Sequence, residues 1–174
     1  MMSRFDIRTE RLVLTPLGPV FLDTVNEYAL DAENTKYMIH LPNDSAQETL
    51  TFLQSVAAEW DREQSASFEF AILYEGRHIG AANICVEGST GELGWIVNRR
   101  YWGNGFAHEA AKAIMDHFAV RFGITHFVAH CDAENVPSWR LMEKLGMERT
   151  GEWPGRRNRA ASRDSIEYQY ELHL

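Results

Sequence analysis

The sequence predicts an α/β fold, and two observations support this prediction. Segments with the period-two pattern of strands alternate along the chain with segments whose apolar residues recur every three or four positions, as in helices. The 174 residues are 45% hydrophobic and 24% charged, which is the composition of a globular protein with a buried core. The sequence has no internal repeat, low-complexity tract or dividing linker, so residues 1–174 are expected to form a single domain.

About seven segments have the features of strands. Residues 68–74 and 78–86 are joined by a short turn that contains Gly76, which predicts a hairpin. A further turn at residues 88–91 leads into the strand that begins at Glu92, so three successive strands are expected to form a meander. The remaining strand-like segments are residues 8–17, 125–131, 147–153 and 164–172.

Four segments have the features of helices. The third ends near Gly123, a residue type that commonly terminates helices. The fourth follows Asn135, a candidate N-cap, and carries Pro137 in its first turn, where the missing N–H of proline has no cost. The four segments are residues 20–30, 44–63, 107–123 and 136–146.

An excess of acidic residues limits what the surface as a whole attracts. Lysine and arginine number 17 against 25 aspartate and glutamate residues, a net charge of −8. The chain gains nothing from general attraction to nucleic acid or to anionic lipid, so neither is an expected partner. An anionic ligand needs a local basic site, and a cationic substrate is mildly favoured.

Cysteine usage and hydropathy predict a cytoplasmic protein. Cys85 and Cys131 lie in apolar strand-like runs and form no spaced framework, which favours a reducing compartment. Residues 1–6 contain no apolar segment of the kind found in signal peptides, and no run approaches the roughly 20 apolar residues that span a bilayer. We therefore expect neither export nor insertion into a membrane.

The most informative segment is residues 92–110, where an apolar strand leads through a loop with Gly103 and Gly105 into a helix. Glycines let a ligand approach the backbone, and the first N–H groups of a helix are unpartnered and lie at its positive end. The segment therefore predicts an anion site. The alternative is a tight strand-to-helix turn whose glycines only permit unusual backbone angles.

Two nucleotide-binding motifs are excluded for this loop. A P-loop requires lysine and then serine or threonine after its second glycine, whereas Phe106 and Ala107 follow Gly105. A dinucleotide-binding fingerprint requires a third small residue where His108 stands, and it follows the first strand of a βαβ unit rather than a meander. The predicted anion is therefore of another kind.

Three motifs together resemble one family. Residues 100–105, Arg-Tyr-Trp-Gly-Asn-Gly, resemble the acyl-CoA-binding signature Arg-x-x-Gly-x-Gly of the GNAT superfamily of N-acetyltransferases. Residues 132–147 are similar to a second element of that superfamily, and residues 9–14 to the opening of the branch with the ribosomal-protein N-terminal acetyltransferases. The resemblance implies a mixed, mostly antiparallel sheet of about seven strands with about four flanking helices. It also implies acetyl transfer from acetyl-CoA to a primary amine, on a protein N-terminus or a small molecule.

The resemblance further implies how acetyl-CoA, the one cosubstrate expected, is held. Backbone N–H groups of residues 100–107 would bind its pyrophosphate, and Asn135 would bond the pantetheine arm. A free N–H on residues 95–97, that of Val97, would stabilise the oxyanion. His108 stands where relatives often have a hydroxyl residue. The cofactor-binding residues expected are Ile96, Val97, Arg99, Arg100, Gly103, Asn104, Gly105, Ala107, His108, Asn135 and Ser138.

Two residues are expected to carry the chemistry. Direct attack on a thioester needs a group that takes a proton from the amine and another that gives one to the leaving thiolate. Ser138 matches the hydroxyl that relatives place near the sulfur, so it is the candidate acid; the alternative is a first-turn residue with only local hydrogen bonds. Glu92 is the candidate base, acting through water; the alternative is a solvated glutamate at the start of a strand.

Several polar groups leave alternatives open. The arginines of residues 156–163 could dock a CoA phosphate, bind an acidic substrate, form a subunit contact or lie in a solvated turn. His126 and His130 share a strand face but stand about 13 Å apart, too far for one ion, so no metal site is expected. The branch suggests a homodimer. The alternative to an enzyme is a non-catalytic CoA-binding or sensing module.

Overall fold

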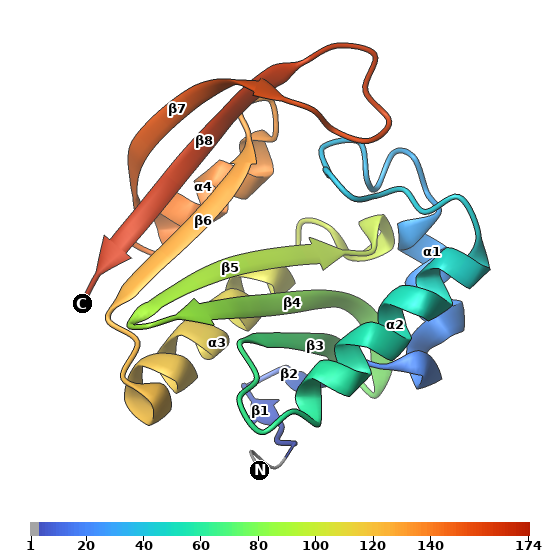
Figure 1. The fold of residues 1–174 in the computed structure, drawn as a ribbon, viewed down its shortest axis with the longest axis vertical. Coiled ribbons are helices and arrows are strands. Elements are labelled where there is room, and N and C mark those ends of the chain that lie inside the picture. Colours follow the sequence, from blue (N-terminus) through green and yellow to red (C-terminus); the bar gives the residue numbers. More distant parts are fainter. Residues whose placement is uncertain (1–3) are drawn as a thin grey trace.

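The computed structural model describes residues 4–174, so the first three residues of the segment examined for an export signal lie outside it. Within the described residues, eight strands form one sheet and four α-helices flank it (Figure 1). The strand order is β1-β2-β3-β4-β5-β6-β8-β7, and among these pairs only β5–β6 is parallel. The predicted α/β fold, with a mixed, mostly antiparallel sheet and four helices, is confirmed.

The sheet has one strand more than the roughly seven predicted. The single strand expected at residues 8–17 is in fact a hairpin of β1 (Ile7–Arg8) and β2 (Leu12–Pro16). Thr9 closes the turn, because its N–H donates to the Leu12 carbonyl at 3.0 Å and its hydroxyl accepts from the Leu12 N–H at 2.8 Å. A turn without glycine or proline carries little local signal, so the two strands looked like one.

The other strands follow the predicted order. β3 (Ser67–Tyr74), β4 (Arg77–Glu87) and β5 (Thr90–Val97) form the expected meander. β6 (His126–Asp132) then joins β5 in parallel after a helical crossover. The last two strands, β7 (Glu148–Arg156) and β8 (Ser165–His173), exchange places in space, so that β8 lies between β6 and β7.

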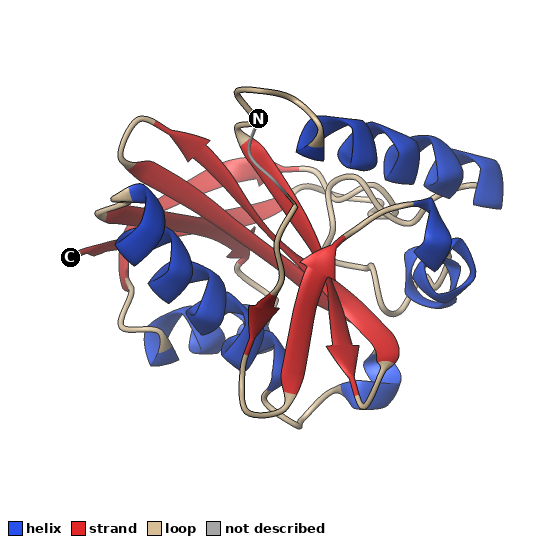
Figure 2. Cartoon of the chain, turned by 90° about the horizontal axis from the view of Figure 1, so that it is seen from below, coloured by secondary structure: helices blue, strands red, loops and turns tan. Residues whose placement is uncertain are grey.

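Helices cover both faces of one half of the sheet and one face of the other half. α1 (Leu22–Ala29) and α2 (Ala46–Trp60) lie on one face, over β3 and β4. α3 (Phe106–Phe122) and α4 (Val136–Lys144) lie on the opposite face, and Figure 2 shows the twisted sheet between the two groups. The face of β6, β8 and β7 opposite α4 therefore carries no helix (Figure 1).

None of the helices within residues 4–174 combines the length and the apolar composition needed to cross a bilayer.

One carboxylate is half-buried beneath α1 and α2. Phe68 and Phe70 of β3 point toward α3, so strand alternation places Glu69 on the other face with Ala71, in the apolar cluster that includes Tyr28 of α1. Burial raises the pKa of Glu69 to about 7. This carboxylate therefore opposes folding at neutral pH.

We expect Glu69→Gln to stabilise the protein at neutral and alkaline pH. The folded-state pKa is about 7 against an ordinary 4.5, so the destabilisation caused by Glu69 is absent below pH 4.5, grows between pH 4.5 and 7, and is fully present above pH 7. The substitution should raise the free energy of unfolding by up to about 3 kcal/mol at pH 8 and change it little at pH 4.5. Denaturant unfolding at both pH values measures this, with exposed Glu87→Gln as the control. An equal effect at both pH values would contradict it.

Candidate active site

β5 and β6 separate partway along their length, which leaves an opening in the sheet. Their parallel pairing ends at Leu93 and Ala129. Beyond that point β5 continues along β4 to Val97, while β6 continues along β8, and Figure 1 shows the two strands diverging. We name this opening, bounded by residues 94–97 of β5 and 130–132 of β6, the fork.

The backbone of β5 directs unpaired N–H groups into the fork. The Asn98 N–H donates to the Ile79 carbonyl at 2.8 Å, toward β4, whereas the Val97 carbonyl points away from β4 and accepts from the Trp102 indole at 2.8 Å. Backbone groups of successive strand residues point to opposite sides, so the N–H groups of Trp95 and Val97 face the fork. A carbonyl placed there can accept hydrogen bonds from them.

The loop after β5 enters α3 through two glycines in the left-handed region. Gly103 has a φ of +79°, and Gly105, the N-cap of α3, a φ of +76°. No side chain caps the helix, so the N–H groups of its first turn, those of Ala107 and His108 included, are available to a ligand. Both glycines and Asn104 are exposed. This is the arrangement that binds anions at the positive end of a helix.

The N-terminal hairpin braces this loop. Arg11 donates from Nη1 to the Asn104 carbonyl at 3.0 Å, and its guanidinium lies 4.7 Å from the centre of the Phe106 ring. Its Nε donates to Glu109 of α3 at 2.7 Å, and the Thr9 hydroxyl donates to the other oxygen of that carboxylate at 2.5 Å. The motif at residues 9–14 therefore contacts the glycine loop directly, although about 90 residues separate the two in the sequence.

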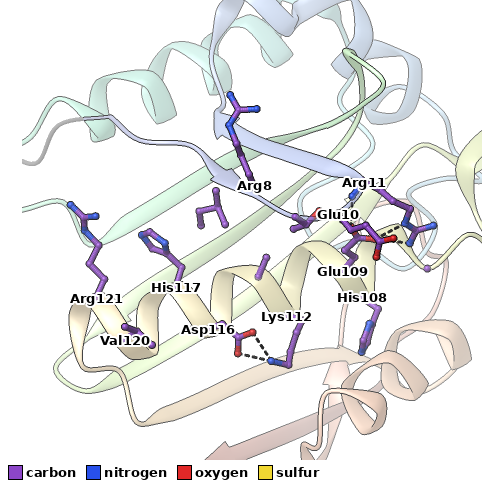
Figure 3. A pocket seen from close by; sticks show the side chains of 14 residues that line it. Arg8, Glu10, Arg11, His108, Glu109, Lys112, Asp116, His117, Val120 and Arg121 are labelled. Atoms are coloured by element: carbon purple, nitrogen blue, oxygen red, sulfur yellow. Dashed lines mark hydrogen bonds and ion pairs between the residues drawn. The ribbon is translucent and has the colours of Figure 1, made fainter.

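A groove of about 1030 Å³ lies beside this contact, between residues 7–11 and α3 (Figure 3). Within it Arg11 faces Glu109, and Lys112 pairs with Asp116 at 2.5 Å. None of the residues that line it comes from β5, β6 or α4. The groove is therefore separate from the fork.

Arg99 and Arg100 are paired with carboxylates at the end of α1 and just after it. Arg99 Nε lies 2.7 Å from Asp31, and Arg100 Nη1 lies 3.5 Å from Glu27. Both arginine side chains are more than half exposed, so these ion pairs are weak and an incoming phosphate could compete for either arginine. Their contact with CoA stays a prediction.

The start of α4 forms the second wall of the fork. Asn135 is the N-cap residue, but only its carbonyl takes part, accepting from the Ser138 N–H at 3.0 Å, and its side chain makes no capping bond. The Ser138 side chain lies near the buried Cys131 thiol and lowers the pKa of that thiol. Burial raises the pKa of Cys131 to about 11, so this thiol stays protonated and is a poor nucleophile.

Glu92 lies against a histidine to which the sequence patterns assigned no catalytic role. Its Oε1 is 2.9 Å from His130 Nδ1, and His130 Nε2 is 2.9 Å from Gln169 Oε1. The hydrogen bond between the two lowers the pKa of Glu92 and raises the pKa of His130. His130 and Cys131 are successive strand residues, so the Glu92–His130 pair and Ser138 flank the fork from opposite faces of the sheet.

The Gln169 amide favours the protonated form of His130. Gln169 Nε2 donates to Glu171 at 2.5 Å, which leaves its oxygen facing His130. The amide oxygen and the Glu92 carboxylate both accept hydrogen bonds, and the imidazolium is the form of His130 that donates from both ring nitrogens. Glu92 and His130 therefore form an ion pair when His130 is protonated. Only the strand register could have revealed it, because no local motif surrounds His130.

The arginines of residues 156–163 all make internal ion pairs. Arg156 is buried and pairs with Glu167 at 2.5 Å. Arg159 bonds Glu48 at the start of α2 at 2.5 Å, and its N–H donates to the Met38 carbonyl at 3.0 Å. The loop therefore joins the C-terminal hairpin to the α1–α2 connection. The remaining pairs are Arg157 with Asp164 and Arg163 with Glu134.

Comparisons of the chain with known proteins identify its relatives. Over 146 residues the chain is 27% identical to the uncharacterised N-acetyltransferase p20 of Bacillus licheniformis, covering 82% of each protein. A shorter match, 42% identical over 62 residues, connects it with the uncharacterised N-acetyltransferase YnaD of Bacillus subtilis. It spans only 36% of each protein.

Solved structures share the fold over almost the whole chain. A GNAT-family acetyltransferase from Bacillus anthracis has a TM-score of 0.82 at 26% identity, covering 97% of this chain and 98% of that one. RimL, a ribosomal L7/L12 α-N-protein acetyltransferase in complex with coenzyme A, has a TM-score of 0.84 at 17% identity, covering 98% of each. The model of the acetyltransferase (GNAT) domain matches residues 11–148. The chain therefore belongs to the GNAT family and is an acetyl-CoA-dependent N-acetyltransferase, as its motifs predicted.

Proposed function

We propose that the protein moves the acetyl group of acetyl-CoA to a primary amine by direct attack of the amine on the thioester, with residues 1–174 as one catalytic domain. The observation that carries the proposal is the arrangement of the fork. Its β5 wall offers unpaired backbone N–H groups, Ser138 flanks it on one face of the sheet, and the Glu92–His130 pair flanks it on the other.

Acetyl-CoA would bind along β5 and the glycine loop. The N–H groups of residues 100–107 would bind the pyrophosphate. The N–H groups of Trp95 and Val97 would hold the acyl end, and the uncapped side chain of Asn135 would bond the pantetheine arm from the opposite wall. Two solved structures of this fold support acetyl-CoA as the ligand. They are RimL in complex with coenzyme A, and the microcin self-immunity acetyltransferase MccE in complex with acetyl-CoA and AMP.

The reaction moves two protons, and the fork has a group for each. We assign proton abstraction from the amine to His130 in its neutral form, held in position by Glu92, which extends the role expected of Glu92 alone. Ser138 would protonate the CoA thiolate on the other face of the sheet. The Trp95 and Val97 N–H groups would stabilise the tetrahedral oxyanion between them. The amine and the leaving thiol would thus lie on opposite faces of the sheet.

The acceptor is best described as a cationic amine. Carboxylates outnumber basic groups over the whole chain, and the arginines near the C-terminal hairpin are neutralised internally. A protein N-terminus and a small-molecule amine both fit this description. We further propose a cytoplasmic location, since Cys85 and Cys131 are free thiols, and a homodimeric assembly.

Release of free CoA thiol on mixing the purified protein with acetyl-CoA and cationic amines tests the function. Ser138→Ala should lower kcat about 100-fold, as expected for loss of a general acid, while CoA affinity is largely kept. Ser55→Ala, at an exposed position of α2, is the control. A protein that does not bind CoA would refute the proposal. CoA binding without turnover of any amine would identify the non-catalytic sensing module instead.

The pH dependence of kcat/KM tests the Glu92–His130 pair. Activity should rise as His130 loses its proton, with a midpoint above the ordinary histidine value of 6.5, because Glu92 raises the pKa of His130. Glu92→Gln removes the carboxylate charge that stabilises the imidazolium, so the midpoint should move to lower pH. Glu87→Gln should leave the midpoint unchanged. An acid limb that stays in place in Glu92→Gln would exclude the pair as the base.

Arg11→Ala tests the brace between the N-terminal hairpin and the glycine loop. Loss of its hydrogen bond to Asn104 should leave the loop less ordered and raise KM for acetyl-CoA by up to about tenfold, with a smaller effect on kcat. Arg8→Ala is the matched control, because Arg8 is exposed and lies 3.7 Å from Asp6. A fall in kcat at unchanged KM would argue against this positioning role.

A further inference from the structure

A second polar cluster lies on the uncovered face of the sheet, where β5 and β6 begin their pairing. His126 of β6 and His173 of β8 are direct cross-strand neighbours, and their rings stack with centroids 4.1 Å apart. Glu171 Oε2 lies 2.6 Å from His126 Nε2 and 3.7 Å from His173 Nε2. One possible ligand atom from each of these three residues lies within 4.8 Å of the other two.

Neighbouring groups orient two of the three side chains. His126 Nδ1 is 3.1 Å from Thr90 Oγ1, which leaves Nε2 directed toward Glu171. The other carboxylate oxygen of Glu171, Oε1, accepts from Thr150 Oγ1 at 2.7 Å and from Gln169 Nε2 at 2.5 Å. Each of the two residues thus has one polar atom fixed by an outer partner and another directed into the cluster. Metal ligands in proteins are oriented in this way.

We propose that His126, Glu171 and His173 bind a divalent transition metal ion, Zn²⁺ in the first instance, with the fourth position open to water. Two imidazoles and one carboxylate are a donor set that Zn²⁺ uses. Tetrahedral ligands about 2.1 Å from the ion lie roughly 3.4 Å from one another, so the cluster needs shifts of about 1 Å and a rotation of the His173 ring out of its stack on His126. His173, with its side chain 73% exposed, is free to make them.

The hydrogen bonds around the cluster remain satisfied when an ion enters. The ion takes the place of the hydrogen between His126 Nε2 and Glu171 Oε2, and a neutral His126 moves its single ring proton to Nδ1 by exchange with solvent. His126 then carries its proton on Nδ1 and donates it to the Thr90 hydroxyl, which can both donate and accept. Glu171 keeps both donors on Oε1. His126 and His130 stand too far apart along β6 for one ion, as the sequence predicted; the second imidazole of this cluster is that of His173, on the neighbouring strand β8.

Titration of chelator-treated protein with Co²⁺ and then Zn²⁺ tests the site. One Co²⁺ should bind per chain with the visible absorption of a four-coordinate ion, and Zn²⁺ should displace it. His173→Ala and Glu171→Gln should weaken binding by at least about tenfold, since loss of an outer partner alone commonly does so. Thr90→Val should also weaken it. His40→Ala removes an exposed histidine from outside the cluster and should bind the ion as the unchanged protein does.

Two results would overturn the proposal. One is the absence of saturable binding by the unchanged protein. The other is binding that both His173→Ala and Glu171→Gln leave intact. The far-ultraviolet circular dichroism of each variant separates loss of the site from loss of the fold. The titration contains no acetyl-CoA or amine, so its outcome is independent of the proposed function.

Discussion

The separation of β5 from β6 is the constraint on which the site depends. Each strand keeps its pairing with its outer neighbour: Val97 stays opposite Gly80 of β4, and Asp132 opposite Glu167 of β8. Glycine is required at position 80, because a Cβ there would lie 2.3 Å from the Ile96 carbonyl oxygen. The β1–β5 half and the β6–β8–β7 half of the sheet therefore twist separately. The gap between β5 and β6 opens while the hydrogen-bonded pairings of β5 with β4 and of β6 with β8 are kept.

Where β5 and β6 separate, the backbone groups that face the gap have no neighbouring strand to hydrogen-bond with, so they need another partner. The N–H groups of Trp95 and Val97 face the fork, and a buried backbone N–H group needs a hydrogen-bond partner. A bound chain with amide and carbonyl groups, such as pantetheine, can take the place that β6 leaves. The two faces of the sheet then bring Ser138 and His130 to the same point from opposite sides.

Features that depend on neighbours in the sequence were predictable, and features that depend on register were not. The glycine loop and the start of α4 are each built within a few residues, so the turn at Gly105 and the N-cap at Asn135 could be predicted from the local pattern, while the role expected of Ser138 rested on the family resemblance. His130 meets Glu92, 38 residues earlier, through a parallel pairing that no local pattern specifies. His173 likewise meets His126 only because β8, not β7, lies beside β6.

The charge of the Glu92–His130 pair bears on the choice of acceptor. The Glu92 carboxylate and the Gln169 amide oxygen both favour the protonated imidazole, which must lose a proton before it can act as a base. An ammonium group that enters the fork lies beside this cation, and the repulsion between like charges lowers the pKa of His130. A cationic amine therefore favours the neutral imidazole that must remove its proton, whereas a neutral acceptor has no such effect. By the same linkage, protonated His130 weakens the binding of an ammonium group, so a cationic acceptor binds best to the neutral imidazole, the form that can remove its proton.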